Sequence, residues 1–122
     1  MIGYVLLGTN DLPRAARFYD ELFATIGVKR MFETDRAIAW GTSFAAPSLG
    51  VCKPYDGKAA SFGNGTMIAL VQTSKENVAA LHKKALELGG KDEGAPGPRG
   101  ENFYGAYFRD LDGNKLCAFI MG

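Results

Sequence analysis

The chain has 122 residues, with 14 Lys and Arg against 13 Asp and Glu and a formal net charge of +1. This length suits one domain, and the balanced charge gives no reason to expect a nucleic acid or an anionic membrane as partner. The first residues, MIGYVLLGTND, have no basic segment or cleavage pattern, and no apolar run approaches the ~20 residues that span a bilayer. Since Cys52 and Cys117 are expected to be reduced thiols, we expect a cytoplasmic protein.

The first half of the chain predicts a strand, a helix and three further strands. Residues 3–9 form the first strand candidate, Asn10 or Asp11 can cap a helix, and Pro13 fits its first turn. The helix has an apolar stripe at three- and four-residue spacing, formed by Leu12, Ala15, Ala16, Tyr19, Leu22, Phe23 and Ile26. Gly27 ends it. The three following strands are predicted at 28–33, 36–42 and 49–53.

The second half of the chain predicts a similar order after a turn-rich linker at 55–65. A strand candidate at 66–72 leads to Thr73 or Ser74 as helix cap. The helix has a buried stripe of Val78, Leu81, Ala85 and Leu88, and Gly89-Gly90 stops it. The Gly- and Pro-rich segment 91–101 is predicted to be a surface loop. Strands at 102–109 and 115–121 follow, joined by a turn at 110–114.

The two halves are related by one gapless shift of 63 residues across strand, cap, helix and helix stop. The shift carries Tyr4 onto Met67, Asn10 onto Thr73, Phe18 onto Leu81, and Ile26-Gly27 onto Gly89-Gly90. Residue identity along this alignment is low, so the evidence is the matched spacing of the elements. Such a duplication indicates two similar modules around a common core. We therefore predict one domain, 1–122, made of a module at 1–54, a linker at 55–65 and a module at 66–122.

Both ends of the chain carry the motifs of a known family. YVLLGTNDLPRAARFYDELFATIGVKR resembles the opening of the glyoxalase/bleomycin-resistance/extradiol-dioxygenase (vicinal oxygen chelate) superfamily, where a strand leads into a DL-x-x-A-x-x-FY helix that ends in glycine. YFRDLDGNKLCAF is similar to the closing hairpin of that family, and GNGTMIAL and VAALHKKALELGGKD resemble the start of its second module. The resemblance covers essentially the whole chain. It implies an α+β fold in which two βαβββ modules form a curved, cup-shaped sheet, often completed by a homodimer.

The resemblance also implies positions for a metal ion. In metal-using members the cup holds one divalent ion, bound by His, Gln or Glu from the first and last strand of each module, which acts as a Lewis acid on two substrate oxygens. The equivalent positions here are Tyr4, Met67 and Cys117, with a fourth near Leu49 or Val51. These side chains do not make the oxygen, imidazole or thiolate set that divalent ions prefer. We therefore expect no metal and no other cofactor.

The single histidine does not change this expectation. His82 lies in the middle of the second predicted helix, on or beside its buried face, and is expected to be a partly buried helix residue outside the cup. With one histidine, the sequence supports no Cys–His or Ser–His catalytic pair. No catalytic residue is predicted.

A cup without a metal is still a concave pocket of the kind that binds small molecules. Strand alternation puts Tyr107 and Arg109 on one face, and the resemblance turns that face inward, towards Cys117 on the partner strand. The predicted pocket has apolar and aromatic walls from Tyr4, Trp40 and Met67. This lining suits a flat, partly aromatic ligand with an anionic group that Arg109 could meet.

Each of these assignments has an alternative. Trp40 and Met67 are also typical core residues, and Arg109 could pair with Asp110 or Asp112 in the hairpin. Catalysis by Cys117 would need a lowered pKa and a nearby base, and the sequence supplies neither.

Three functions stay open. The first is a metal-free protein that binds a small-molecule ligand, as in the bleomycin-resistance branch, and that forms a homodimer. The second is a metal-dependent glyoxalase-like lyase/isomerase or dioxygenase with unusual ligands. The third is a non-catalytic dimeric protein with a structural or regulatory role. The first predicts that replacing Tyr107 or Arg109 weakens ligand binding more than replacing His82.

Overall fold

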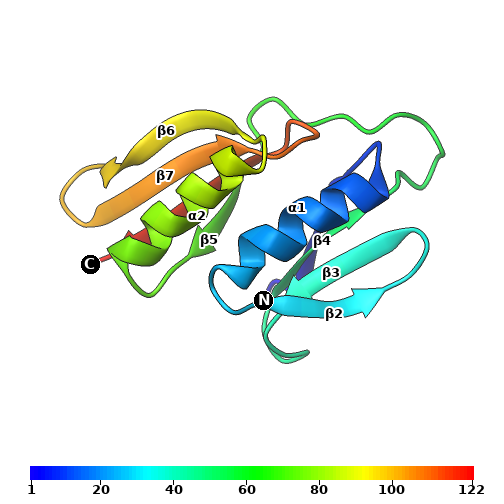
Figure 1. Cartoon of the computed structure of the whole chain (residues 1–122). Helices are drawn as coiled ribbons and strands as arrows, with labels where there is room; N and C mark the ends of the chain where they lie inside the picture. The colour runs from blue at the N-terminus through cyan, green and yellow to red at the C-terminus, as the bar shows by residue number, and fades with distance from the viewer.

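The computed structural model describes residues 1–122 and contains two four-stranded sheets, each with one helix on one face (Figure 1). The first module contains β1 (Tyr4–Gly8), α1 (Leu12–Ala24), β2 (Lys29–Glu33), β3 (Ala37–Gly41) and β4 (Ser48–Cys52). The second contains β5 (Ile68–Val71), α2 (Lys75–Glu87), β6 (Lys91–Pro98), β7 (Phe103–Arg109) and β8 (Lys115–Met121). The strand orders, β1-β4-β3-β2 and β5-β8-β7-β6, are the same, and the first strand of each module runs parallel to the last. The predicted α+β fold of two βαβββ modules is confirmed.

The two helices begin and end as the sequence predicts. Asp11 caps α1 and Ser74 caps α2, and each side chain accepts a hydrogen bond from the backbone N–H three residues on, at 3.0 Å. Gly27 and Gly89 follow the helices with positive φ angles of 72° and 98°, which glycine adopts without strain. The shift of 63 residues carries the bounds of α1 onto those of α2. Neither helix is long and apolar enough to cross a membrane.

The prediction of a surface loop at 91–101 is wrong. Most of it forms β6, the edge strand that pairs antiparallel with β7. The ladder is irregular around Gly94 and Gly97, and Pro96 lies on the same strand. Edge strands tolerate proline and glycine because one side of the strand forms no ladder hydrogen bonds. Composition therefore predicted a loop where the chain forms an irregular strand.

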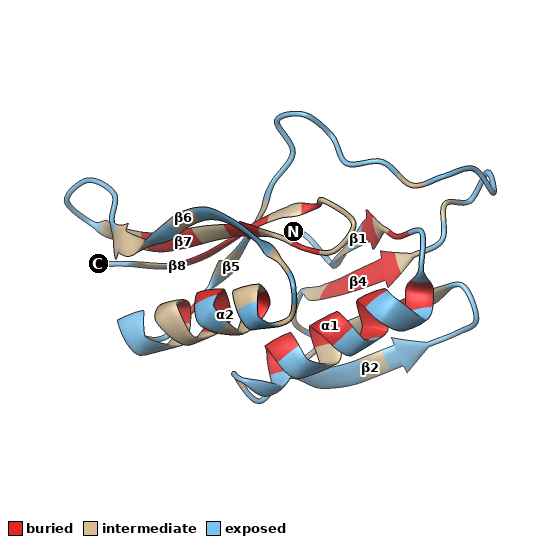
Figure 2. Cartoon of the chain, turned by 45° about the horizontal axis from the view of Figure 1, so that its top comes forward, coloured by how far each residue is buried: buried red, intermediate tan, exposed pale blue.

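The core lies between the helices and the sheets and is shared by both modules. Side chains from both helices and both sheets belong to one continuous buried cluster, which includes Leu22 of α1 and Leu81 of α2. Figure 2 shows this burial on the sides of the helices and strands that face one another. Because the two helices also pack against each other, neither module buries its helix alone.

Both helices lie on the same side of the two sheets, so each sheet keeps a second face that no helix covers (Figure 1). We call this the uncovered face. Strand register places alternate residues on it. In the first sheet these are Tyr4, Leu6, Ala37, Ala39, Ser48, Gly50 and Cys52. In the second sheet they are Ala69, Val71, Phe103, Gly105, Tyr107, Arg109, Lys115, Cys117 and Phe119.

A buried polar network joins the modules at one end of their interface. One carboxylate oxygen of Asp110 accepts hydrogen bonds from the Tyr19 hydroxyl at 2.6 Å and from the Asn114 amide at 3.0 Å. The other accepts the backbone N–H groups of Asp112 and Asn114, both at 2.9 Å. The Asn114 amide also donates to the carbonyl of Gly8 at the end of β1. We call Tyr19, Asp110, Asp112 and Asn114 the interface network.

Candidate ligand-binding site

Three of the predicted pocket residues meet on the uncovered face of the second sheet. Tyr107 of β7 lies directly across the ladder from Cys117 of β8, and Arg109 lies across from Lys115. Ala69 of β5 flanks Cys117 on its other side. Cys117 has no exposed surface although it belongs to the uncovered face, because neighbouring side chains cover it. Tyr107 is half-buried, and its side chain stands at the centre of this group.

The two acidic groups at this centre are neutral at physiological pH. Burial raises the pKa of the Cys117 thiol, and this outweighs the lowering effects of Tyr107 and of the positive charges on Arg99 and Lys115. Burial also raises the pKa of Tyr107, with a further contribution from Cys117. Thiol and phenol therefore remain protonated. Cys117 has neither the lowered pKa nor the adjacent base of a nucleophilic cysteine.

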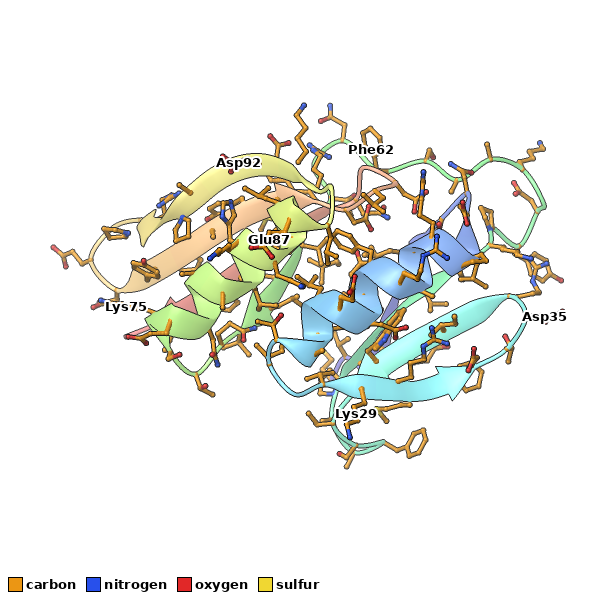
Figure 3. All side chains as sticks on the ribbon, in the orientation of Figure 1. Lys29, Asp35, Phe62, Lys75, Glu87 and Asp92 are labelled. Carbon is orange, nitrogen blue, oxygen red and sulfur yellow. The ribbon has the colours of Figure 1, made fainter.

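Arg109 is held by its own sheet rather than left free. Its Nε donates to Glu93 of β6, and a terminal nitrogen donates to the carbonyl of Gly113 at 2.8 Å. Its guanidinium lies 5.3 Å from the centre of the Phe62 ring, which Figure 3 labels beside the turn between β7 and β8. The pKa of the Glu93 carboxyl is lowered chiefly by its hydrogen bond from Arg109. The alternative ion pair of Arg109 with Asp110 or Asp112 of the hairpin does not form, because Arg109 pairs with Glu93 instead.

Four further residues belong to this site, and the sequence pointed to only one of them. Lys115 lies two residues before Cys117 on β8, so alternation alone would place it on the same face. Arg99 comes from the turn after β6, and its guanidinium lies 5.6 Å from the Tyr107 ring centre. The position of Glu93 beside Arg109 could not be predicted, because its strand, β6, was predicted as a loop. Phe62 comes from the linker, where no periodicity exists to predict its position.

Tyr4 lies on the uncovered face of the other sheet. It is 68% exposed and pairs in register with Ser48 of β4, while Leu6 pairs with Gly50. The neighbours of Leu6 on this face of β3 and β4 are small, among them Ala39 and Gly50. The structure gives no contact between this surface and Tyr107 of the same chain.

Trp40 lies on the opposite side of its sheet from Tyr4. Its side chain is 1% exposed and faces α1, where the indole N–H donates to Asp20 at 2.9 Å. Its ring lies 5.4 Å from the Tyr19 ring and 6.0 Å from the Phe23 ring. Trp40 is a core residue of the first module and does not share a surface with Tyr107.

Met67 and Trp40 line a cleft of about 510 Å³ between β5 and the first module, which borders the uncovered faces at Ser48, Ala69 and Val71. The lining is mostly apolar and carries no charged side chain, and Gln72 is its largest polar group. Met67 itself is 41% exposed. The predicted pocket is thus divided among three surfaces: the two uncovered faces and this cleft.

His82 lies outside all three surfaces. It is buried on α2, and its Nε2 lies 3.0 Å from a carboxylate oxygen of Asp92 on β6, which is labelled in Figure 3. The pKa of Asp92 is lowered first by the backbone N–H of Gly94 and then by His82. The histidine therefore connects its helix to the edge of its own sheet.

The side chains at the metal positions implied by the resemblance do not fit a divalent ion. Tyr4 and Cys117 are on different sheets, and Met67 lines the cleft. Leu49 and Val51, proposed for the fourth position, point towards α1 and are buried, so the β4 residues on the uncovered face are Ser48, Gly50 and Cys52. No three His, Cys, Asp or Glu side chains gather where they could hold a metal ion.

Comparison with known proteins agrees with this architecture. A crystal structure of a glyoxalase/bleomycin resistance protein from Albidiferax ferrireducens T118 is 33% identical, covers 100% of this chain and 99% of its own, and superposes with a TM-score of 0.92. Two others share the fold alone. A glyoxalase/bleomycin resistance protein/dioxygenase family enzyme from Burkholderia phytofirmans PsJN has 18% identity, 98% coverage of both chains and a TM-score of 0.78. A glyoxalase-related enzyme from Fulvimarina pelagi has 20% identity, covers 98% of this chain and 87% of its own, and has a TM-score of 0.77.

Among curated proteins, none matches the chain. The sequence model of the Glyoxalase/Bleomycin resistance protein/Dioxygenase superfamily matches residues 1–118, which includes every strand and helix except the last three residues of β8. The match, the shared fold and the 33% identical structure agree. The chain therefore belongs to the Glyoxalase/Bleomycin resistance protein/Dioxygenase superfamily.

Proposed function

We propose that this protein binds a small organic molecule, without a metal ion, on the uncovered face of its second sheet. The observation that carries the proposal is the Tyr107–Cys117 pair, which combines an aromatic wall with a neutral hydroxyl group on a face that no helix covers. Small-molecule sites typically have apolar and aromatic walls with a few polar groups that orient the ligand. The Phe103 and Phe119 rings extend this wall, stacked 5.2 Å apart on the same face.

We further propose that a second copy of the chain covers this face. Large apolar side chains remain exposed on both uncovered faces, with Tyr4 at 68% and Val71 at 70%. Exposed apolar patches of this kind favour association. Because both faces look away from the helices, a twofold dimer can place the face around Leu6 over the partner's second sheet. The ligand would then lie between two modules of different chains.

Ligand binding is tested with a screen of small aromatic molecules by ligand-observed NMR and thermal shift. A molecule that binds the native state must raise its stability by mass action. For each molecule that binds, we expect Tyr107→Ala to weaken binding by about tenfold or more, because it removes the central wall. The control is Tyr55→Ala, which removes a 99% exposed tyrosine of the linker. Equal affinities for the two variants would place the ligand elsewhere.

The second copy is tested by sedimentation equilibrium. We expect a dimer that Leu6→Lys weakens, because the substitution places a charge in an apolar contact. Tyr55→Lys adds the same charge to the linker and should leave the dimer intact. A monomer at all concentrations, or a dimer that neither variant affects, would contradict the proposed cover.

Metal independence is tested directly. The purified, untagged protein is incubated with Zn²⁺, Ni²⁺, Mn²⁺ and Fe²⁺ and then passed through a desalting column, and its metal content and melting temperature are measured. We expect no retained ion and no shift in melting temperature. Retention of about one ion per chain with a raised melting temperature would instead favour a metal-dependent lyase/isomerase or dioxygenase.

A further inference from the structure

The uncovered face of the second sheet carries more positive than negative charge. Arg109 and Lys115 lie on the ladder and Arg99 lies above Tyr107, while the one carboxylate among them is Glu93. Arg109 forms an ion pair with Glu93, and one of its terminal nitrogens donates a hydrogen bond to the backbone carbonyl of Gly113. Arg109 is thus already neutralised and held in place. The remaining charge belongs to Arg99 and Lys115.

Arg99 is positioned by backbone rather than by a carboxylate. Its terminal nitrogens donate to the carbonyls of Ala95 at 2.7 Å and Pro98 at 3.3 Å, and it forms no ion pair. A side-chain carbon on Gly94 would come within 3.3 Å of this guanidinium and within 2.9 Å of the Tyr107 ring. The glycine therefore leaves the space in which Arg99 folds back over the sheet towards Tyr107.

Lys115 approaches the same tyrosine from the neighbouring strand. Its ammonium nitrogen lies 5.6 Å from the Tyr107 ring centre, the same distance as the Arg99 guanidinium. It also forms no ion pair within hydrogen-bonding range, although Glu93 is close enough to feel its charge. Both cations lower the pKa of the Cys117 thiol, against the larger raising effect of burial. Two cations without a carboxylate of their own thus flank one protonated phenol.

An aromatic surface begins next to these charges. Phe119 is two residues from Cys117 on the same face of β8, a separation of about 7 Å along a strand. Its ring stacks on Phe103 with an interplanar angle of 4°. A ligand with a planar ring and an anionic group at one end could therefore place its ring against Phe103 and Phe119 and its anionic group near Arg99 and Lys115.

We propose that Arg99 and Lys115, rather than Arg109, select the ligand, and that the ligand class is an aromatic carboxylate with its carboxylate at Tyr107 and its ring at Phe103 and Phe119. This inference rests on the proposed function, because it names the class of molecule that the same face binds. The Tyr107 hydroxyl donates to the carboxylate, and the two cations neutralise it. Charge-assisted hydrogen bonds of this kind are stronger than neutral ones.

The test compares 2-naphthoate with 2-naphthamide, which has the same ring and no charge. Their dissociation constants are measured by isothermal titration calorimetry on the full chain at low salt, for the wild type and for Arg99→Gln/Lys115→Gln. The matched control is Arg17→Gln/Lys83→Gln, which removes two positive charges from exposed positions on the helices. Circular dichroism confirms that each variant is folded.

We expect the wild type and the control to bind naphthoate at least about tenfold more tightly than naphthamide. The double variant should lose this preference and keep its affinity for naphthamide. If the double variant keeps the preference for naphthoate, or if the wild type binds both probes equally, the anion selection is wrong while the binding face stands. If the wild type binds neither probe up to millimolar concentration, the proposed function itself fails for aromatic ligands, and this inference fails with it.

Discussion

The interface between the two modules has two sides, which the shared fold of the modules would make equivalent. In the structure the two sides differ. On one side, the turn between β7 and β8 reaches the first module and forms the interface network with Tyr19 and Gly8. On the other side, the segment between β3 and β4 makes no side-chain hydrogen bond to the second module, and the cleft lies there. The shift of 63 residues carries Tyr19 onto His82 and Gly8 onto Val71. His82 pairs with Asp92 of its own module instead.

This difference shows that a duplicated fold need not duplicate its interface. One carboxylate, Asp110, satisfies four donors from both modules, so this side has a fixed geometry. The cleft side is lined by apolar side chains and is incompletely filled. We infer that the interface network sets how the two sheets are oriented, while the cleft side leaves room for adjustment.

The largest effect is expected from Asp110→Ala. The substitution leaves the buried Tyr19 hydroxyl without an acceptor and removes one of the two acceptors of the Asn114 amide, so it should lower the free energy of unfolding by about 3 kcal/mol or more. Urea denaturation at pH 7 measures this change. Glu21→Ala, an exposed carboxylate on α1 with no side-chain partner, should change it by less than about 0.5 kcal/mol. Similar values for the two variants would show that the network does not hold the modules together.

Tyr19→Phe should have the next largest effect. It removes one charge-assisted hydrogen bond to Asp110 and leaves the aromatic packing against Phe18 and Trp40, so we expect a loss of about 2 kcal/mol. Tyr55→Phe removes a hydroxyl from an exposed residue and serves as the control in the same urea titration. The idea of a network fails if the two losses are equal.

Asp20→Asn removes a carboxylate that supports Trp40, one of the residues lining the cleft, and should cost about 0.5–1 kcal/mol at pH 7. Asp20 accepts the Trp40 indole N–H and two hydrogen bonds from Arg30, and the Arg30 guanidinium lowers the pKa of this carboxyl from its usual 3.8. A lowered pKa gives stability that is present above about pH 4 and is lost as the pH falls through the folded-state value. The difference between wild type and Asp20→Asn should therefore shrink between pH 5 and pH 2. A difference that is constant with pH would show that the ion pair contributes nothing.

Met67→Ala should have the smallest effect. Met67 is partly exposed on a cleft that is not filled, so its removal leaves little new cavity, and we expect a loss below about 0.5 kcal/mol. Leu81→Ala, at a fully buried position of α2, provides the contrast with an expected loss of about 3 kcal/mol. A large loss at Met67 would mean that the cleft side is as tightly packed as the rest of the core.

The elements that the sequence predicted correctly are those whose signals are local. Helix periodicity, the caps at Asp11 and Ser74, and the glycines after the helices are read within a few residues, and all of them agree with the structure. β6 was missed because its Gly94, Pro96 and Gly97 are typical of loops, and only pairing with β7 makes the segment a strand.

The candidate site was harder to predict because it depends on which face each strand turns to the helix. Alternation grouped Tyr107, Arg109 and Cys117 correctly on one face. It could not orient β3, where apolar residues occupy both faces and only the size of Ile38 and Trp40 marks the buried one. The partner of Arg109 was missed for a related reason, since Glu93 lies on the strand that was predicted as a loop.

The linker between β4 and β5 joins two sheets that share no rung of backbone hydrogen bonds, and it runs along the outside of the molecule (Figure 1). Each sheet therefore closes using only residues of its own half of the chain, so no strand pairing has to bring the two halves together. Contacts of long separation, such as Tyr19 with Asp110, form only when the halves dock. We expect the order of folding to follow this division, with docking of two partly formed halves as the slow step. A nick at an exposed linker residue such as Tyr55 would leave both ladders intact, and the two fragments should reassemble into the native structure.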